Sequence, residues 1–314
     1  SKSEAEKVAA LARSLSVDMA QSPDWAARQA RMSSRKLPTR VLEQLLTFRE
    51  LGTDLGALVL RGLTVGPVNA TPANNSEGTA RCTQMGRTAL LIASALGDPI
   101  GYEAEGNGHL IQDMVPAKKL AHTQQSQGSR VDLEVHTEQM FSPLRPDWVV
   151  LACLRGDPDA KTYLFTARQL CEALTLEEIN ALREPRWATT IDESFQSLVP
   201  DPQQVRGPMP ILSGPVDDPT IVFDQDLIRG LDPEAERLKE RIIEINREKR
   251  NHHVLMPGDI AILDNSRAIH GRSSFSPKFD GSDRFIARLM AVRDRYALRQ
   301  ALLPDGRTVA ARFS

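Results

Sequence analysis

Hydrophobic and polar positions change their spacing along the chain. In residues 38–52, apolar side chains recur every three or four positions, which is the spacing of one helix face. Pro38 stands near the start of this segment and Gly52 just past its end, as helix boundaries prefer. A second helix is expected over 80–96, and a short apolar run at 57–63 predicts a strand. The first hundred residues are therefore predicted to be mostly helical.

Continuous apolar runs replace this helical spacing in the middle of the chain. The segment 148–154 (WVVLACL) is apolar throughout and begins with an aromatic and two β-branched residues, which is typical of a buried strand. Six prolines in 200–219 predict an irregular connection or a lid. The other expected elements are strands at 162–165, 259–263 and 284–292 and helices at 168–182 and 233–249.

The order of these elements indicates the fold class. Helices come first and strands follow with long interruptions, which argues against alternating βαβ units. We predict a mainly β fold with helices, in which a distorted double-stranded β-helix (jelly roll) core has flanking α-helices. One domain, 1–314, is expected to contain a mostly helical part (1–100), a core with a lid and a helical insert (101–295) and a tail (296–314).

Composition excludes several classes of protein. The formal net charge of -2 argues against a nucleic-acid-binding surface. No apolar run approaches the roughly 20 residues that span a bilayer, and the charged N-terminal segment lacks the apolar core of a signal peptide. The three cysteines show no CxxC spacing, which argues against a disulfide framework. We expect a cytoplasmic protein with a small-molecule partner and no nucleic-acid or membrane partner; the oligomeric state stays open.

Two histidines and a glutamate suggest a metal site. His136 and Glu138 are two positions apart in an extended segment, so their side chains point the same way. His270 follows the expected strand at 259–263 and is predicted to lie in a turn before Gly271. Two histidines and one carboxylate on one face, with positions left open, form the arrangement of non-haem Fe(II) oxygenases. Because an isolated His-x-Glu pair is more often structural, the interpretation depends on two arginines that follow.

Arg284 and Arg288 lie on the last expected strand, after His270. At four positions apart they share one face of that strand. Burying them is costly unless each meets an anion, and a planar guanidinium suits a carboxylate. One is expected to bind the distal carboxylate of 2-oxoglutarate and the other the carboxylate of a second ligand. The alternative, that both face solvent, stays open from the pattern alone.

Two long segments resemble the clavaminate synthase family, which includes arginine and asparagine β-hydroxylases of peptide-antibiotic pathways. They are EVHTEQMFSPLRPDWVVLACLR at 134–155 and PGDIAILDNSRAIHGRSSFSPKFDGSDR at 257–284. The resemblance implies a distorted jelly roll in which His136, Glu138 and His270 bind Fe(II). It also implies 2-oxoglutarate and O2 as cosubstrates.

The same resemblance implies roles for residues around the metal. Arg284, helped by Thr162, is expected to bind the C5 carboxylate of 2-oxoglutarate, and Arg288 to bind the α-carboxylate of the substrate. Asp224 and Asp226 resemble the Asp-x-Asp pair with which arginine hydroxylases bind a guanidinium. On an extended chain the two carboxylates face one way and suit a cation, although a solvated acidic turn is an equal alternative.

Two further residues and one segment complete the expected site. Glu105 and Ser126 fall near positions that hold the substrate backbone in relatives. The polar segment 122–130 (HTQQSQGSR) is predicted to be a mobile lid.

The predicted activity is hydroxylation of an unactivated C–H bond in an amino acid, in natural-product biosynthesis. Free L-arginine or a related cationic amino acid is the first candidate substrate. Glu138 argues against a halogenase, in which this carboxylate is missing. Alternatives with the same cofactors are desaturation, oxidative cyclisation, and a carrier-bound or non-cationic substrate. A non-catalytic jelly-roll amino-acid-binding protein and a zinc hydrolase are alternatives from other classes, but intact iron ligands argue against the first and the arginine pair has no role in the second.

Overall fold

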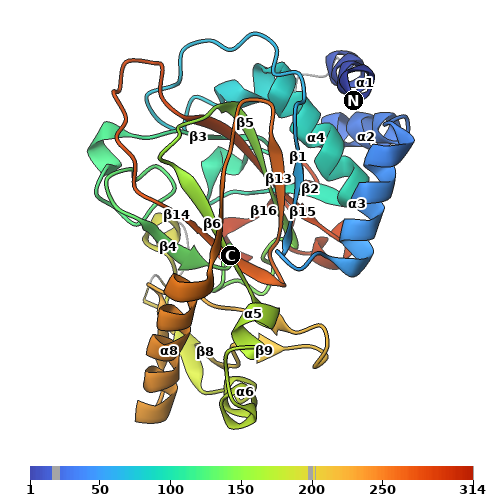
Figure 1. The fold of residues 1–314 in the computed structure, drawn as a ribbon. Coiled ribbons are helices and arrows are strands. Elements are labelled where there is room, and N and C mark those ends of the chain that lie inside the picture. The colour runs from blue at the N-terminus through green and yellow to red at the C-terminus, as the bar shows by residue number, and fades with distance from the viewer. Residues whose placement is uncertain (16–21, 197–200, 202, 314) are drawn as a thin grey trace.

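Two sheets form the centre of the molecule (Figure 1), and the computed structural model describes residues 1–15, 22–196, 201 and 203–313. In spatial order the larger sheet contains β1 (Ala57–Leu60), β13 (Ile260–Asp264), β5 (Trp148–Arg155), β15 (Phe285–Val292), β2 (Asp98–Tyr102) and β16 (Thr308–Val309), and β3 (Gln112–Met114) also pairs with β15. The smaller sheet contains β12 (Asn251–Val254), β6 (Lys161–Thr166), β14 (Ala268–Arg272) and β4 (Leu133–His136). All of these pairs are antiparallel except β16 with β2. The predicted jelly-roll class is confirmed.

Strand alternation places the two predicted arginines inside the molecule. Along β15, Phe285, Ala287 and Leu289 pack into the core beneath the N-terminal helices. Ile286 lies on the opposite face, in the core between the sheets, and Arg284 and Arg288 line a cavity there. Each of the two arginines is only 5% exposed. Both arginines therefore face inward, and the alternative that they face solvent is excluded.

Four helices lie on the outer side of the larger sheet (Figure 1), where α4 packs directly on β15 and β5 and the other three pack against α4. They are α1 (Lys2–Arg13), α2 (Pro23–Ser34), α3 (Thr39–Leu51) and α4 (Gln84–Leu96). Short 3₁₀ helices lie at Thr79–Cys82, Gly106–Gly108, Lys118–Leu120, Arg295–Leu298 and Ala311–Phe313. The predicted ends of α3 are confirmed, since Gly52 follows it with a φ of 67°, a conformation that glycine adopts without strain. Within the described ranges, no helix combines the length and apolar character needed to cross a membrane.

A helical lobe packs on the outer face of the smaller sheet (Figure 1). Phe165 of β6 and Ile269 of β14 enter its core, while the residues next to them point toward the other sheet. The lobe contains the helices α5 (Ala167–Cys171), α6 (Leu176–Leu182), α7 (Glu193–Gln196) and α8 (Pro233–Lys249) and the short strands β7 (Trp187–Thr189), β8 (Arg206–Met209), β9 (Leu212–Ser213), β10 (Thr220–Ile221) and β11 (Ile228–Gly230).

Two predictions for this lobe need correction. The expected helix at 168–182 is two helices, because Thr166 and Thr175 each begin a new one with a capping box. The segment 200–219 is not wholly irregular, since β8 and β9 lie within it; Pro200 and Pro202 fall outside the described residues.

Arg307 joins the tail of the chain to the N-terminal helices and to the larger sheet. Its Nε donates to Asp24 Oδ1 at 2.9 Å, and its Nη1 donates to Asp98 Oδ1 and to the Pro99 carbonyl, both at 3.3 Å. Burial by itself raises the pKa of Asp24, but hydrogen bonds from Arg307 and Arg28 lower it below its ordinary value. The Arg307 side chain is only 5% exposed, and its removal takes away the ion pair that the structure shows for the partly buried Asp98. Asp24 loses its most buried partner and keeps the more exposed Arg28 and Arg295.

We expect Arg307→Met to lower the free energy of unfolding by about 2–3 kcal/mol, as measured by urea denaturation. Arg28→Met is the matched control, because Arg28 contacts the same Asp24 but is 61% exposed. Its loss is expected to cost about 0.5 kcal/mol or less. Equal losses in the two variants would show that the buried connection carries no special stability.

Candidate active site

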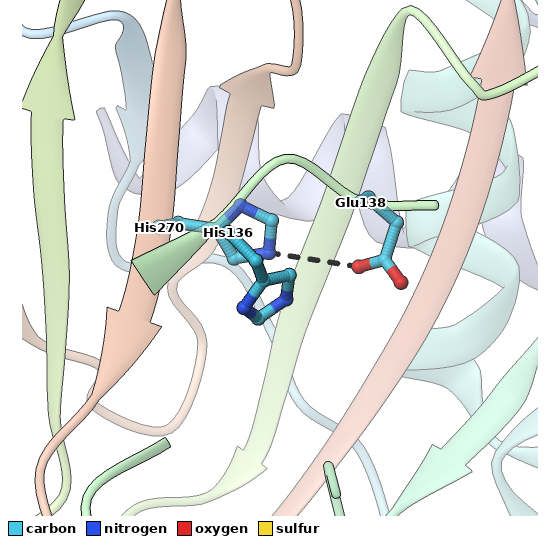
Figure 2. A group of neighbouring side chains, drawn as sticks. All are labelled: His136, Glu138 and His270. Atoms are coloured by element: carbon cyan, nitrogen blue, oxygen red, sulfur yellow. Dashed lines mark ion pairs between the residues drawn. The ribbon is translucent and has the colours of Figure 1, made fainter. Parts of the chain in front are cut away.

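Two imidazoles and one carboxylate converge where β4 and β14 lie side by side (Figure 2). His136 ends β4, His270 lies directly opposite it in β14, and Glu138 follows in the segment after β4. One ligand atom from each residue lies within 4.8 Å of the others, and His270 Nε2 is 3.5 Å from Glu138 Oε2. The structure therefore brings together the three residues that were predicted to bind a metal. The prediction that His270 stands in a turn is wrong, because strand pairing with β4 and β6 orients it.

Backbone contacts orient two of these side chains. His136 Nδ1 lies 2.8 Å from the Glu134 carbonyl, which can only accept, so Nδ1–H donates and Nε2 is left free. Asn265 holds the backbone of Glu138 from both sides: its Oδ1 accepts from the Glu138 N–H at 2.7 Å, and its Nδ2 donates to the Glu138 carbonyl at 3.1 Å. Asn265 was not predicted from the sequence, where it stands in the polar stretch 264–266 (DNS) that follows the apolar residues of a strand.

Arg288 sits among acceptors beside the triad. Its Nη1 lies 3.2 Å from Glu138 Oε1, its Nη2 pairs with Glu105, and Gln112 Oε1 accepts from its Nε at 3.0 Å. Burial raises the pKa of Glu138, but Arg288 and the hydrogen bond to His270 outweigh it and hold that pKa well below its usual range. At Glu105, by contrast, burial outweighs Arg288 and raises the pKa.

The triad fits an Fe(II) ion by the chemistry of its donors. Glu138 is ionised at neutral pH, and burial lowers the pKa of His270, so that its imidazole is neutral there. Two imidazoles and one carboxylate on one side of a cavity leave the other coordination positions open. This is the donor set of non-haem Fe(II) oxygenases.

A second polar region, beyond the triad, is positively charged. Arg272 stands two residues after His270 in β14 and directly opposite Thr162 in β6, so all three side chains share the inward face. Arg272 and Arg284 are 4% and 5% exposed, and neither makes an ion pair with any residue that the structure describes. Burial lowers the pKa of both guanidiniums, and Arg284 lowers that of Arg272 further. Two buried cations without a counter-ion fit an anionic ligand.

One cavity of about 220 Å³ between the two sheets connects these regions. Every site residue that the sequence predicted lines this cavity. They are His136, Glu138, His270, Arg284, Thr162, Arg288, Asp224, Asp226, Glu105 and Ser126. The structure therefore brings the predicted residues together, while their individual roles stay predictions.

The predicted aspartate pair lies at an acidic end of the cavity, in a different backbone conformation from the expected one. The chain is not extended here but turns after Asp224, whose Oδ1 accepts the N–H groups of Asp226 and Leu227 at 2.9 and 3.0 Å. Burial raises the pKa of Asp224 to about 6, although His136 opposes this shift, and Asp226 is exposed. Glu134 and Asp192, which sequence reasoning missed, line the same cavity.

Two neighbouring segments complete the lining. Ser126 is present as predicted, but its carbonyl oxygen, not its side chain, makes the contact that the structure shows, by accepting from Arg272 Nη1 at 3.3 Å. Gln139, which was not predicted, has a φ of 53° and donates from Nε2 to Glu105 Oε2 at 3.0 Å. Its Oε1 is buried with no hydrogen-bond partner among the described residues. The mobility of the segment 122–130 stays a prediction.

Comparison with known proteins places this site in a family. Residues 23–290 match the family described as taurine catabolism dioxygenase TauD, TfdA family. An L-lysine 3-hydroxylase of Catenulispora acidiphila is 50% identical over 91% of this chain and 81% of its own length. Clavaminate synthase 2 of Streptomyces clavuligerus is 31% identical over 85% of this chain and 83% of its own.

The fold closely resembles that of a solved relative. A crystal structure of asparagine oxygenase, in complex with Fe(II), (2S,3S)-3-hydroxyasparagine and succinate, has a TM-score of 0.91 and 31% identity. The alignment covers 99% of this chain and 98% of that one. The protein therefore belongs to the TauD/TfdA dioxygenase family, among its clavaminate synthase-like Fe(II)- and 2-oxoglutarate-dependent oxygenases.

Proposed function

We propose that this enzyme hydroxylates the side chain of a free basic L-amino acid, with L-lysine as the first candidate. The observation that carries the proposal is the division of one cavity into three regions: a triad that fits Fe(II), two uncompensated guanidiniums, and an acidic end. Sequence reasoning ranked L-arginine first. The 50% identity to an L-lysine 3-hydroxylase supports lysine ahead of it.

In this proposal the chain's own residues divide the work of binding. His136, Glu138 and His270 hold Fe(II), and Arg284 with Thr162 holds the distal carboxylate of 2-oxoglutarate. When bound together, Fe(II) and 2-oxoglutarate supply O2 activation for C–H hydroxylation, with succinate and CO2 as co-products. The protein must hold one C–H bond of the substrate near the metal and exclude water.

The backbone of an amino acid fits beside Arg288. Arg288 and Glu105 pair with each other, so they present adjacent charges of opposite sign on the cavity wall. A zwitterion with a carboxylate next to an ammonium group requires such a pair. The unpaired Oε1 of Gln139 lies in the side chain that also contacts Glu105, and it provides another acceptor for the α-ammonium group.

The side chain of the substrate fits the acidic end of the cavity. Asp224, Asp226, Glu134 and Asp192 bring four carboxyl groups to its lining, and a cation there relieves their mutual repulsion. The raised pKa of Asp224 reflects burial without a full counter-charge. A lysine ammonium, which is a compact point charge, and an arginine guanidinium both match this region by charge.

Product analysis tests the proposed reaction directly. We expect the protein, incubated with Fe(II), 2-oxoglutarate, O2 and a panel of free amino acids, to add one oxygen atom to L-lysine with equimolar succinate, measured by mass spectrometry. Zn(II) in place of Fe(II) is expected to give no product. A loss of two hydrogens would instead indicate desaturation or cyclisation, and a reaction with neutral amino acids alone would contradict the proposed cationic substrate.

Asp224→Asn tests the role of the acidic end. The amide oxygen can still accept the two N–H groups of the turn, so the variant removes charge with little change of shape. We expect the KM for L-lysine to rise about tenfold or more, while binding of Fe(II) is unchanged.

Glu177→Gln makes the same charge change on the exposed surface of α6 and is the matched control, for which no change is expected. An unchanged KM in Asp224→Asn, with full metal content, would exclude this carboxylate from side-chain recognition.

A further inference from the structure

Arg272 is a buried cation that forms no direct ion pair with the described residues, although the charge of Asp132 acts on it and raises its pKa. Its side chain lines the cavity, the residue is 4% exposed, and it forms no ion pair within the part of the chain that the structure describes. Its Nη2 is buried without a hydrogen-bond partner in that same part. An arginine in this state is costly for the folded protein unless a ligand supplies the missing negative charge.

The position of Arg272 points to one end of the cavity. It lies across β14 and β6 from Thr162, and its guanidinium lies 5.0 Å from the centre of the Phe275 ring. The guanidinium of Arg284 lies 6.0 Å from the centre of the same ring. Arg272 thus lies beside Thr162 and close enough to Arg284 for the two charges to repel, and all three residues line the cavity. The proposed function assigns the distal carboxylate of 2-oxoglutarate to this part of it.

Backbone contacts hold the Arg272 guanidinium in place without neutralising it. Its Nε donates to the Ser273 carbonyl at 3.1 Å and its Nη1 to the Ser126 carbonyl at 3.3 Å. Carbonyl groups satisfy donors but carry no net charge, so the positive charge stays available. A rigid guanidinium loses little conformational entropy when it binds an anion.

We propose that Arg272 is a second binding residue for the distal carboxylate of 2-oxoglutarate, acting together with Arg284. The inference rests on the proposed function, which places the cosubstrate at this end of the cavity. Two guanidiniums around one carboxylate strengthen the preference for a dicarboxylic 2-oxoacid over a 2-oxoacid whose chain ends in a methyl group, because only the former supplies the missing charge.

Ligand binding without turnover tests this inference. The Fe(II)-loaded enzyme is titrated anaerobically with 2-oxoglutarate or with 2-oxopentanoate, which replaces the distal carboxylate by a methyl group. The dissociation constants are read from the visible charge-transfer absorption of the chelate. We expect Arg272→Met to raise the Kd for 2-oxoglutarate about tenfold or more and to change the Kd for 2-oxopentanoate by less than about twofold.

Two further variants sharpen the comparison. Arg272→Lys keeps the charge but loses the planar fork, so an intermediate Kd for 2-oxoglutarate is expected. Arg130→Met is the matched control, because Arg130 is exposed on the neighbouring segment and contacts Ser276 Oγ outside the cavity. It is expected to leave both dissociation constants unchanged.

The outcomes separate this inference from the proposed function. If Arg272→Met weakens both ligands equally, Arg272 only supports the surrounding structure and the inference is wrong. It is also wrong if neither ligand is affected while the wild-type protein binds 2-oxoglutarate. If the wild-type protein does not bind 2-oxoglutarate at all, the proposed function itself fails.

Discussion

The pairing of β14 with β4 on one side and with β6 on the other determines the geometry of the site. Pairing with β4 places His270 opposite His136, and pairing with β6 places Arg272 opposite Thr162. Because side chains alternate along a strand, His270 and Arg272 share the inward face while Ile269 enters the core of the helical lobe. A slip of β14 by one residue would exchange these faces and expose Ile269 to the cavity. Burial of Ile269 in the lobe therefore disfavours such a slip.

The charged groups that line the cavity differ in how far the protein compensates them. Near the triad, Arg288 is surrounded by Glu105, Glu138 and Gln112, so its charge is compensated by the protein. Arg272 and Arg284 form no ion pair with the described residues, and burial raises the pKa of Asp224 elsewhere in the lining. The lining of one cavity therefore contains both buried guanidiniums and carboxyl groups. In the proposed function, an anionic cosubstrate meets the guanidiniums and a cationic substrate side chain meets the carboxyl groups, so that binding would offset part of the cost of burying these charges.

Sequence reasoning was most accurate where one local pattern carries the information. The alternation around Arg284 and the ends of α3 were predicted, because each depends on the period of a strand or on a boundary residue. The residues of the triad meet as predicted, but Glu138 lies in a turn after β4 and not on the extended segment that the His-x-Glu spacing led us to expect. The strand around His270 was missed, since a segment of five residues that ends in Gly-Arg has too little periodicity to distinguish it from a turn. Recognising that strand would also have placed Arg272 on the inward face.

Other features depend on contacts between distant segments. The turn after Asp224 and the convergence of Glu134 and Asp192 arise from the packing of the helical lobe, which no local period encodes. The break between α5 and α6 is different, because Thr166 with Gln169 and Thr175 with Glu178 form readable start signals within the segment.

Asn265 has a consequence for how this enzyme can change over time. It lies in the short connection from β13 to β14, the strand that contains His270. The same connection therefore also hydrogen-bonds the backbone of Glu138. Glu138 and His270, which are far apart in the sequence, are thus both positioned by the β13–β14 connection. A mutation in this connection is expected to disturb both. Asp192 and Asp226 lie on the helical lobe, outside this connection. Under the proposed function, substitutions in the lobe would therefore alter substrate preference without disturbing the connection that supports Glu138 and His270.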